Sequence, residues 1–232
     1  MAILLDNHAA DRPDQPALID ERGETTWAEL KTRVTKLSRA FADRGIGSGD
    51  TIAVMMGNRR ELFEILLAAA HTGFTVVPVN WHWVADELAY VIEDSGARAL
   101  LVGERFADIG TAALADPRAA GIEFSAVAGA GAFDDYEDLL ASGADDPLEE
   151  QLLGGPMFYT SGTTGRPKGV VLTQSNFGHQ AETLPPLFTM GPKERFLSIL
   201  PPWHSFERTV EYAALSSGAG IAYTDRRRLR ED

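Results

Sequence analysis

Residues 157–173 read MFYTSGTTGRPKGVVLT, a stretch in which a loop of glycines and hydroxyl residues separates two apolar runs. The apolar runs at 157–160 and 170–173 are typical of short strands. A helix is predicted to follow from about Gln174. A strand, a glycine-rich loop and a helix in close succession are typical of α/β proteins, in which strands and helices alternate.

The remainder of the chain shows the same alternation. Short apolar runs predict strands at 51–56, 74–79, 98–102, 123–128, 196–200 and 220–224. Apolar residues at three- and four-residue steps predict helices at 27–41, 62–70, 85–94, 134–140 and 206–216. The predicted fold class is therefore α/β, with doubly wound, mostly parallel sheets.

Two local patterns predict where elements begin and where the chain changes direction. Thr26 with Glu29, and Asn58 with Glu61, have the spacing of a capping box at a helix start. Residues 141–153 mix glycine, aspartate and proline, and we expect a linker there.

The composition restricts the class of protein. Hydrophobic residues make up 44% and charged residues 24% of the 232 positions, as in ordinary globular chains. The net charge of −13 disfavours general binding to nucleic acid, which requires a basic face. The absence of cysteine excludes disulfides and thiolate catalysis. No apolar run approaches the roughly 18 residues that span a bilayer, and we expect a cytoplasmic protein.

The loop at 159–169 has the composition of a polyphosphate-binding site. Glycines let backbone N–H groups approach an anion, hydroxyl groups donate hydrogen bonds, and a lysine supplies positive charge. A solvent-exposed glycine-rich turn is the alternative interpretation. The loop is not a Walker A motif, because Pro167 precedes Lys168 and Gly169 follows it. The predicted phosphate-binding residues are Thr160, Ser161, Gly162, Thr163, Thr164, Gly165 and Lys168.

This loop resembles the signature phosphate loop of the adenylate-forming (AMP-binding) superfamily, which holds acyl-CoA synthetases, luciferases and the adenylation domains of peptide synthetases. Residues 5–18 (LDNHAADRPDQPAL) and 79–90 (VNWHWVADELAY) also resemble segments of these enzymes. The resemblance covers essentially the whole chain. It implies that residues 1–232 are the N-terminal portion of a synthetase or ligase domain, with the phosphate loop at 159–169.

The resemblance also implies a two-step reaction with ATP, Mg²⁺ and CoA. A carboxylate attacks the α-phosphorus of ATP and releases pyrophosphate, and a thiol then displaces AMP from the acyl adenylate. The loop from Thr160 to Lys168 would hold the departing pyrophosphate, and Lys168 would be a catalytic residue. The thiol is that of CoA or of a carrier-protein phosphopantetheine. No nucleic-acid partner is expected.

A second group of residues follows a predicted strand at LPPWHSFER, residues 200–208. His204 resembles the histidine that these synthetases place beside the acyl and adenylate pocket, which makes it the second predicted catalytic residue. A histidine packed in the core is the alternative. Glu207 and Arg208 are expected to pair with each other or face solvent. The other histidines lack metal-ligand spacing, and no side-chain metal site is predicted.

The form of residues 200–225 is most similar to long-chain fatty acyl-CoA synthetases and related acyl-carrier-protein synthetases. Long-chain substrates would allow peripheral association with membranes. Members of the family continue well beyond the length of this chain, so we expect a fragment with an incomplete second sheet, no C-terminal domain and no full turnover by itself. The remaining portion could be a separate chain.

Two other classes of function remain open from the sequence. The first is a catalytically incomplete nucleotide-binding or interaction module, which would bind ATP without turning it over. The second is an unrelated kinase or NTPase, which would release ADP where adenylate formation releases AMP. The sequence does not fix the length of the acyl chain or the identity of the thiol acceptor.

Overall fold

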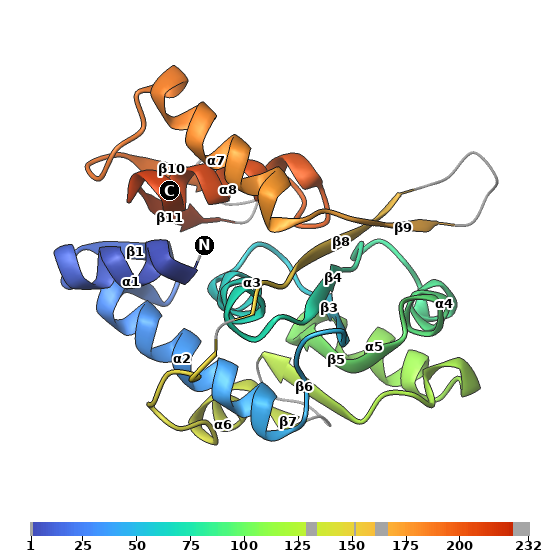
Figure 1. Cartoon of the computed structure of the whole chain (residues 1–232). Helices are drawn as coiled ribbons and strands as arrows, with labels where there is room; N and C mark the ends of the chain where they lie inside the picture. Colours follow the sequence, from blue (N-terminus) through green and yellow to red (C-terminus); the bar gives the residue numbers. More distant parts are fainter. Residues whose placement is uncertain (1, 129–133, 151, 161–166, 225–232) are drawn as a thin grey trace.

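The computed structural model of the chain describes residues 2–128, 134–150, 152–160 and 167–224. A seven-stranded sheet contains β3 (Thr51–Met55), β4 (Thr75–Pro78), β5 (Ala97–Gly103), β6 (Phe124–Ala128), β7 (Asp134–Asp135), β8 (Gly155–Thr160) and β9 (Lys168–Val171). Its strand order is β7-β6-β5-β3-β4-β8-β9 (Figure 1). All neighbouring pairs are parallel except β8 and β9. The predicted α/β class with mostly parallel sheets is confirmed.

A second, four-stranded sheet joins the two ends of the described chain. It contains β10 (Arg195–Ser198), β11 (Gly220–Tyr223), β1 (Pro16–Asp20) and β2 (Gly23–Thr26), in that order. β1 is parallel to β11, and Leu18 is the register partner of Ile221. β1 and β2 were not among the expected strands, because residues 23–26 are polar and β1 pairs with a strand about 200 residues away.

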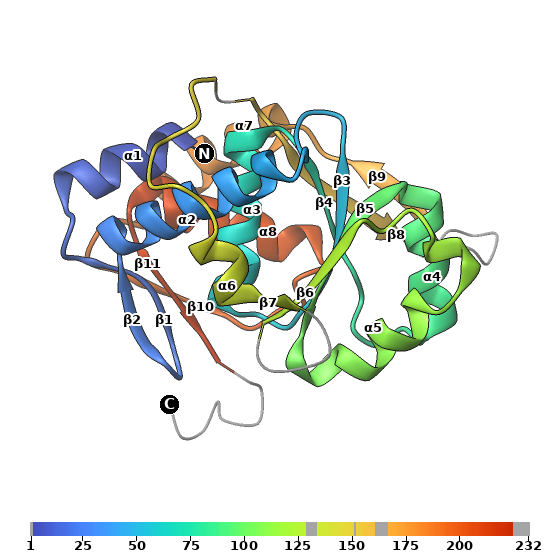
Figure 2. The ribbon, with the colours of Figure 1, turned by 90° about the horizontal axis from the view of Figure 1, so that it is seen from below.

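The helices form layers on and between the two sheets (Figures 1 and 2). α4 (Ala85–Ser95) and α5 (Ala107–Leu114) cover one face of the seven-stranded sheet, where Leu88 and Val91 pack on β3 and β5. The opposite face and the space between the sheets are filled by α2 (Trp27–Asp43), α3 (Arg60–Thr72) and α6 (Tyr136–Ala141), with α1 (Ala2–Asp11), α7 (Gln174–Phe188) and α8 (Ser205–Ser217). Two short 3-10 turns, Glu104–Phe106 and Pro117–Ala119, flank α5.

α3 lies at the centre of this arrangement, between the two sheets. Leu62 and Ile65 belong to the core on the seven-stranded sheet, whereas Phe63 and Leu67 belong to the core that includes the four-stranded sheet. Because α3 is covered on both sides, apolar residues surround its axis rather than forming a single stripe. Within the described ranges, no helix has the length and apolarity required to cross a membrane.

The two predicted helix caps had different outcomes. Thr26 and Glu29 form the expected capping box at the start of α2, through hydrogen bonds of 3.2 and 2.8 Å. The prediction for Asn58 was wrong, because α3 begins at Arg60 after Arg59 as the N-cap residue. The Asn58 amide instead donates to the Leu200 carbonyl at 2.6 Å, on the segment that leaves β10. The contact with Leu200 thus takes the place of the expected capping box with Glu61.

The described residues of the predicted linker at 141–153 connect α6 to β8 without a further helix or strand, but they pack on their neighbours. Arg39 of α2 donates hydrogen bonds to the carbonyls of Asp146 and Pro147, at 2.7 and 2.8 Å. The Gly154 N–H, just beyond the segment, donates to the Ala69 carbonyl of α3 at 3.1 Å. β8 then joins the same sheet as β3 to β7, so this segment is a connection within one packed unit.

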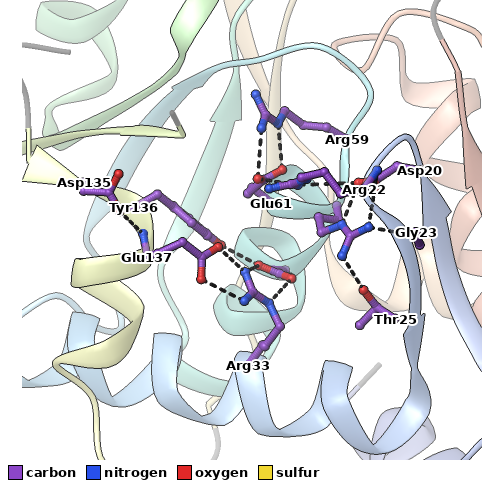
Figure 3. A network of polar contacts seen from close by, with 12 residues as sticks. Asp20, Arg22, Gly23, Thr25, Arg33, Arg59, Glu61, Asp135, Tyr136 and Glu137 are labelled. Carbon is purple, nitrogen blue, oxygen red and sulfur yellow. Dashed lines mark hydrogen bonds and ion pairs between the residues drawn. The ribbon is translucent and has the colours of Figure 1, made fainter. Parts of the chain in front are cut away.

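Two buried glutamates of α3 join the N-terminal hairpin and α6 to the core (Figure 3). Arg33 of α2 pairs with Glu64 at 2.6 Å and with Glu137 of α6 at 2.7 Å. Arg22 of the β1–β2 hairpin pairs with Glu61 at 2.5 Å, and Arg59 pairs with the same carboxylate at 2.6 Å. Arg59 and Arg22 outweigh burial at Glu61 and lower its pKa, whereas burial outweighs Arg33 at Glu64 and raises the pKa of that carboxyl.

Candidate functional site: the glycine-rich hairpin and the β10–α8 segment

The two ends of the glycine-rich loop lie next to each other on a β-hairpin. Thr160, the last residue of β8, is the register partner of Lys168, the first residue of β9. Both residues are exposed. The predicted residues Ser161, Gly162, Thr163, Thr164 and Gly165 lie outside the described residues. The second strand begins two residues earlier than expected, so Lys168 lies on the strand rather than in the loop.

The hairpin leaves the sheet at the edge where its parallel strands end. β8 runs parallel to β4, and β4 runs parallel to β3, so the carboxyl ends of all three strands meet at one edge. Ligands of open α/β sheets bind in the crevice outside this edge. The glycine-rich loop therefore begins where a small-molecule site is expected.

α4 holds both sides of the loop by hydrogen bonds. The Tyr159 hydroxyl, just before the loop, donates to Oδ2 of Asp94 at 2.7 Å. The Tyr90 hydroxyl donates to the carbonyl of Pro167, just after the loop, at 3.2 Å. Burial and the neighbouring Asp94 carboxylate raise the pKa of Tyr159, which keeps its phenol protonated as a donor. The sequence gives no local signal for these contacts, because Asp94 and Tyr159 are 65 positions apart.

Gly169 is opposite Tyr159 in the hairpin register. A Cβ atom at this position would lie 2.9 Å from the Met157 sulfur and 3.3 Å from the Tyr159 ring. The glycine thus leaves room for the Met157 side chain and, less closely, for the Tyr159 ring.

The β10–α8 segment places the second predicted catalytic residue. His204 is the N-cap residue of α8, and its Nδ1 atom accepts a hydrogen bond of 3.3 Å from the Phe206 N–H. Its ring is exposed. The preceding Trp203 packs edge-on against Trp81, with ring centroids 4.3 Å apart. Trp81 lies in the loop that follows β4, the strand beside β8.

The hairpin and the β10–α8 segment therefore meet the same part of the seven-stranded sheet. β4 pairs with β8, which carries the loop, and the residues after β4 carry the aromatic contact to Trp203. Trp81 also stacks on Phe106 at 6.4 Å, which fixes the indole against the core. The aromatic pattern at 81–83 was the sequence signal for this contact.

The expected pairing of Glu207 with Arg208 was wrong, because Arg208 pairs with Glu211 one helical turn along α8. Neither side chain faces solvent, and each residue is only 1% exposed. Glu207 instead accepts a hydrogen bond of 2.5 Å from Ser198 at the end of β10. The spacing of Arg208 and Glu211 was the available sequence signal.

Two hollows among the described residues lie outside this site. A groove of about 450 Å³ lies over β2 and α2, beside Thr25, Thr32 and Arg33. A smaller hollow of about 240 Å³ lies beside Phe124 and α6. In the part of the chain that the structure describes, no three His, Asp or Glu side chains converge as metal ligands.

The sequence matches the family model described as AMP-binding enzyme over residues 5–232. The chain therefore belongs to the AMP-binding enzyme family. It is 32% identical over 210 residues to a sulfoacetate–CoA ligase of Cupriavidus necator, which covers 88% of this chain and 40% of that protein. It is 31% identical over 185 residues to the long-chain-fatty-acid–CoA ligase FadD13 of Mycobacterium tuberculosis, covering 77% of this chain and 35% of the relative.

A third relative is the fatty acid–[acyl-carrier-protein] ligase ScoC of Streptomyces coeruleorubidus, 31% identical over 174 residues, 73% of this chain and 32% of that protein. Among solved structures, the N-terminal domain of FACL13 from Mycobacterium tuberculosis aligns with a TM-score of 0.86 and 26% identity. The alignment covers 96% of this chain and 56% of that one. The chain spans less than half the length of these curated relatives.

Proposed function

We propose that the chain forms the ATP-phosphate-binding part of an adenylate-forming acid–thiol ligase. The observation that carries the proposal is the β8–β9 hairpin, which places Thr160 opposite Lys168 at the carboxyl edge of the sheet. The family match over residues 5–232 supports the same chemistry. The loop residues Ser161, Gly162, Thr163, Thr164 and Gly165 complete the proposed phosphate site.

In the proposed reaction, a carboxylate oxygen bonds to the α-phosphorus of ATP as the bond to pyrophosphate breaks. The thiol sulfur then bonds to the acyl carbon as the bond between that carbon and the AMP oxygen breaks, and the thiol proton is released to solvent. Mg²⁺ bound to ATP would neutralise part of the charge of the phosphates. Lys168 supplies a fixed positive charge for the leaving pyrophosphate, and the backbone of the loop orients the phosphate chain.

The proposed acid is a long-chain fatty acid, and His204 lies beside it. Ile199, Leu200 and Phe206 expose apolar side chains around the same segment. The relative named as a long-chain-fatty-acid–CoA ligase supports this choice. The relative named as a sulfoacetate–CoA ligase makes a short, charged acid the comparison substrate. We propose that the reaction occurs in the cytoplasm, with peripheral membrane association when the substrate is a long-chain acid.

The proposed thiol is CoA. The relative named as an acyl-carrier-protein ligase favours carrier-protein phosphopantetheine as the second candidate acceptor. The alternative function is a nucleotide-binding module that binds ATP without turnover.

The product nucleotide and its oxygen label test the proposal. The chain, together with the remaining portion of the ligase, is incubated with MgATP, CoA and palmitate labelled with ¹⁸O in the carboxylate, and the nucleotides are separated and weighed by mass spectrometry. The proposal expects AMP carrying one ¹⁸O atom, because the attacking carboxylate oxygen stays on phosphorus when the thiol displaces AMP. ADP release would contradict it.

Two further arms separate the alternatives. Replacing CoA by a phosphopantetheinylated carrier protein identifies the acceptor, and replacing palmitate by sulfoacetate identifies the acid. Binding of MgATP without AMP formation in any arm would favour the nucleotide-binding module. AMP formation that begins only when a second polypeptide is added would assign part of the reaction to a partner chain.

A further inference from the structure

A buried polar cluster lies under the segment that carries Trp203 and His204. At its centre is the Ser198 hydroxyl at the end of β10, which is 2.5 Å from Glu207 Oε1 and 2.9 Å from Glu211 Oε1. The Asn58 amide, at the approach to α3, donates to the same hydroxyl at 3.0 Å. Ser198 and Glu211 are 0% exposed, and Glu207 is 1% exposed.

The cluster has too few hydrogen atoms for all of its contacts to be hydrogen bonds if both carboxyl groups are ionised. A serine hydroxyl has one hydrogen and can donate one hydrogen bond, whereas an ionised carboxylate can only accept. Ser198 has a carboxyl oxygen of Glu207 and one of Glu211 within hydrogen-bond distance, and the Asn58 amide is itself a donor. Both carboxyl contacts are satisfied only if one carboxyl group is protonated and donates to the serine oxygen.

The charges of the cluster also indicate one proton on the two carboxyl groups. Arg208 is 1% exposed and forms its ion pair with Glu211. One guanidinium and two carboxylates would leave a net charge of −1 in the core, and one proton brings the sum to zero. Unpaired buried charge is costly, so the neutral arrangement is favoured.

The other titratable groups that face the cluster do not change this sum. They are the phenols of Tyr212 on α8 and Tyr223 on β11, which burial keeps protonated by raising their pKa values, and the more remote Glu64, which pairs with Arg33 but whose pKa burial raises. Burial also raises the pKa of Glu211, to about 7, and that of Glu207, with Arg208 opposing the shift in both. Two carboxyl groups that interact this closely titrate as a pair.

We propose that Glu207 and Glu211 share one proton through Ser198, and that this cluster positions the segment 199–204 and its residues Trp203 and His204. Asn58 is the link, because its amide donates both to Ser198 Oγ and to the Leu200 carbonyl, at 3.0 and 2.6 Å. The cluster therefore fixes the start of the segment to the residues before α3. Its relevance to catalysis rests on the proposed function, whereas the shared proton does not.

Loss of the shared proton at high pH leaves an uncompensated negative charge in the core. The folded protein holds a proton that the unfolded chain releases near the ordinary glutamate pKa, so stability falls as pH rises from about 4.5 to the folded value. Above the pKa of the folded pair, the cluster under segment 199–204 carries a net negative charge and positions the segment less firmly. Trp203 should report this change, because its ring packs against Trp81.

The direct test is carbon NMR of the chain labelled at the glutamate side-chain carboxyl carbons. We expect one carboxyl resonance to titrate with a midpoint near pH 7, and the Trp203 indole N–H signal to shift with the same midpoint. Glu207→Gln should remove both transitions, because the neutral amide can donate to Ser198 without a shared proton. Glu182→Gln, an exposed change on α7, is the matched control.

Three results would overturn the proposal. They are titration of every glutamate carboxyl below about pH 5, persistence of the neutral-pH transition in Glu207→Gln, and a carboxyl transition that leaves Trp203 unmoved. The wild-type titration requires neither a variant nor a substrate. It remains decisive if Glu207→Gln fails to fold, and it can succeed even if the chain proves to lack ligase activity.

Discussion

The hydroxyl of Tyr159 lies 2.7 Å from Oδ2 of Asp94, so the last turn of α4 holds the strand that enters the glycine-rich loop. Tyr90, one turn earlier on α4, donates to the Pro167 carbonyl where the chain leaves the loop. The separation of the two loop ends is therefore fixed by a helix that packs on the sheet. Such support from outside the loop is what a phosphate site requires to be pre-organised.

Tyr159→Phe tests this support. The change removes the hydroxyl and leaves the ring, and it should cost about 1 kcal/mol of stability as a lost hydrogen bond. It should also weaken MgATP binding, because the entry to the loop is no longer fixed. Thermal unfolding and calorimetric titration measure the two effects.

The control is Asp94→Asn, which keeps an acceptor oxygen for Tyr159 and should have a smaller effect than Asp94→Ala. If Tyr159→Phe changed neither stability nor MgATP affinity, α4 would have no part in supporting the loop.

Gly154→Ala should be strongly destabilising. A Cβ atom at this position would lie 2.0 Å from the Phe74 carbonyl and 2.5 Å from the Ala69 carbonyl, and backbone atoms cannot move aside as a flexible side chain can. We expect a loss of about 1–3 kcal/mol or more, by the overpacking of a tight contact. Chemical denaturation measures the change.

The matched variant is Gly178→Ala on α7, where the added methyl group meets no atom within 4 Å. In a helix interior, this change should stabilise the protein by about 0.5–1 kcal/mol. Equal effects of the two substitutions would show that the close approach of Gly154 to α3 is absent in solution.

Glu61 should make the protein sensitive to acid. Burial acts to raise the pKa of Glu61, but Arg59 and Arg22 outweigh burial and lower it below the usual 4.5. Between the lowered folded value and the ordinary unfolded value, the unfolded chain binds more protons. The stabilisation by Glu61 is thus complete above about pH 4.5 and is lost as the pH falls through the folded pKa.

Glu61→Gln should therefore be less stable than the wild type at pH 7, and the difference should shrink below pH 4. Urea denaturation at a series of pH values measures both curves, with the exposed Glu149→Gln as control. A difference that is constant from pH 7 to pH 3 would argue against an ionised, arginine-paired Glu61.

The sequence predicts local features well and distant contacts poorly. The capping box of Thr26 and Glu29 needs only four consecutive residues, and it forms as expected. Asn58 has the same local pattern, but a carbonyl 142 positions away takes its amide. The pattern of apolar residues predicted most strands of the seven-stranded sheet and the helices that pack on it. The strand β1 was missed because its parallel partner, β11, is at the other end of the chain.

The same reason limits the prediction of the site. The composition of the loop indicated phosphate binding, because glycines, hydroxyls and Lys168 are contiguous in the sequence. Its supports on α4 are not contiguous with it, and Ser198 meets Glu207 and Glu211 only after β10 and α8 have packed. From the sequence alone, a charged residue such as Arg208 is expected at the surface, but Arg208 is buried in the fold.

In the proposed function, Lys168 on the β8–β9 hairpin binds the phosphates of ATP. The most direct measurement is calorimetric titration of the chain with MgATP and with magnesium pyrophosphate, for the wild type, Lys168→Met and the exposed control Lys193→Met. Loss of a charged hydrogen bond worth about 1.5–3 kcal/mol predicts roughly 10- to 150-fold weaker binding of both ligands to Lys168→Met, with Lys193→Met unchanged. Equal affinities for all three proteins would contradict the claim.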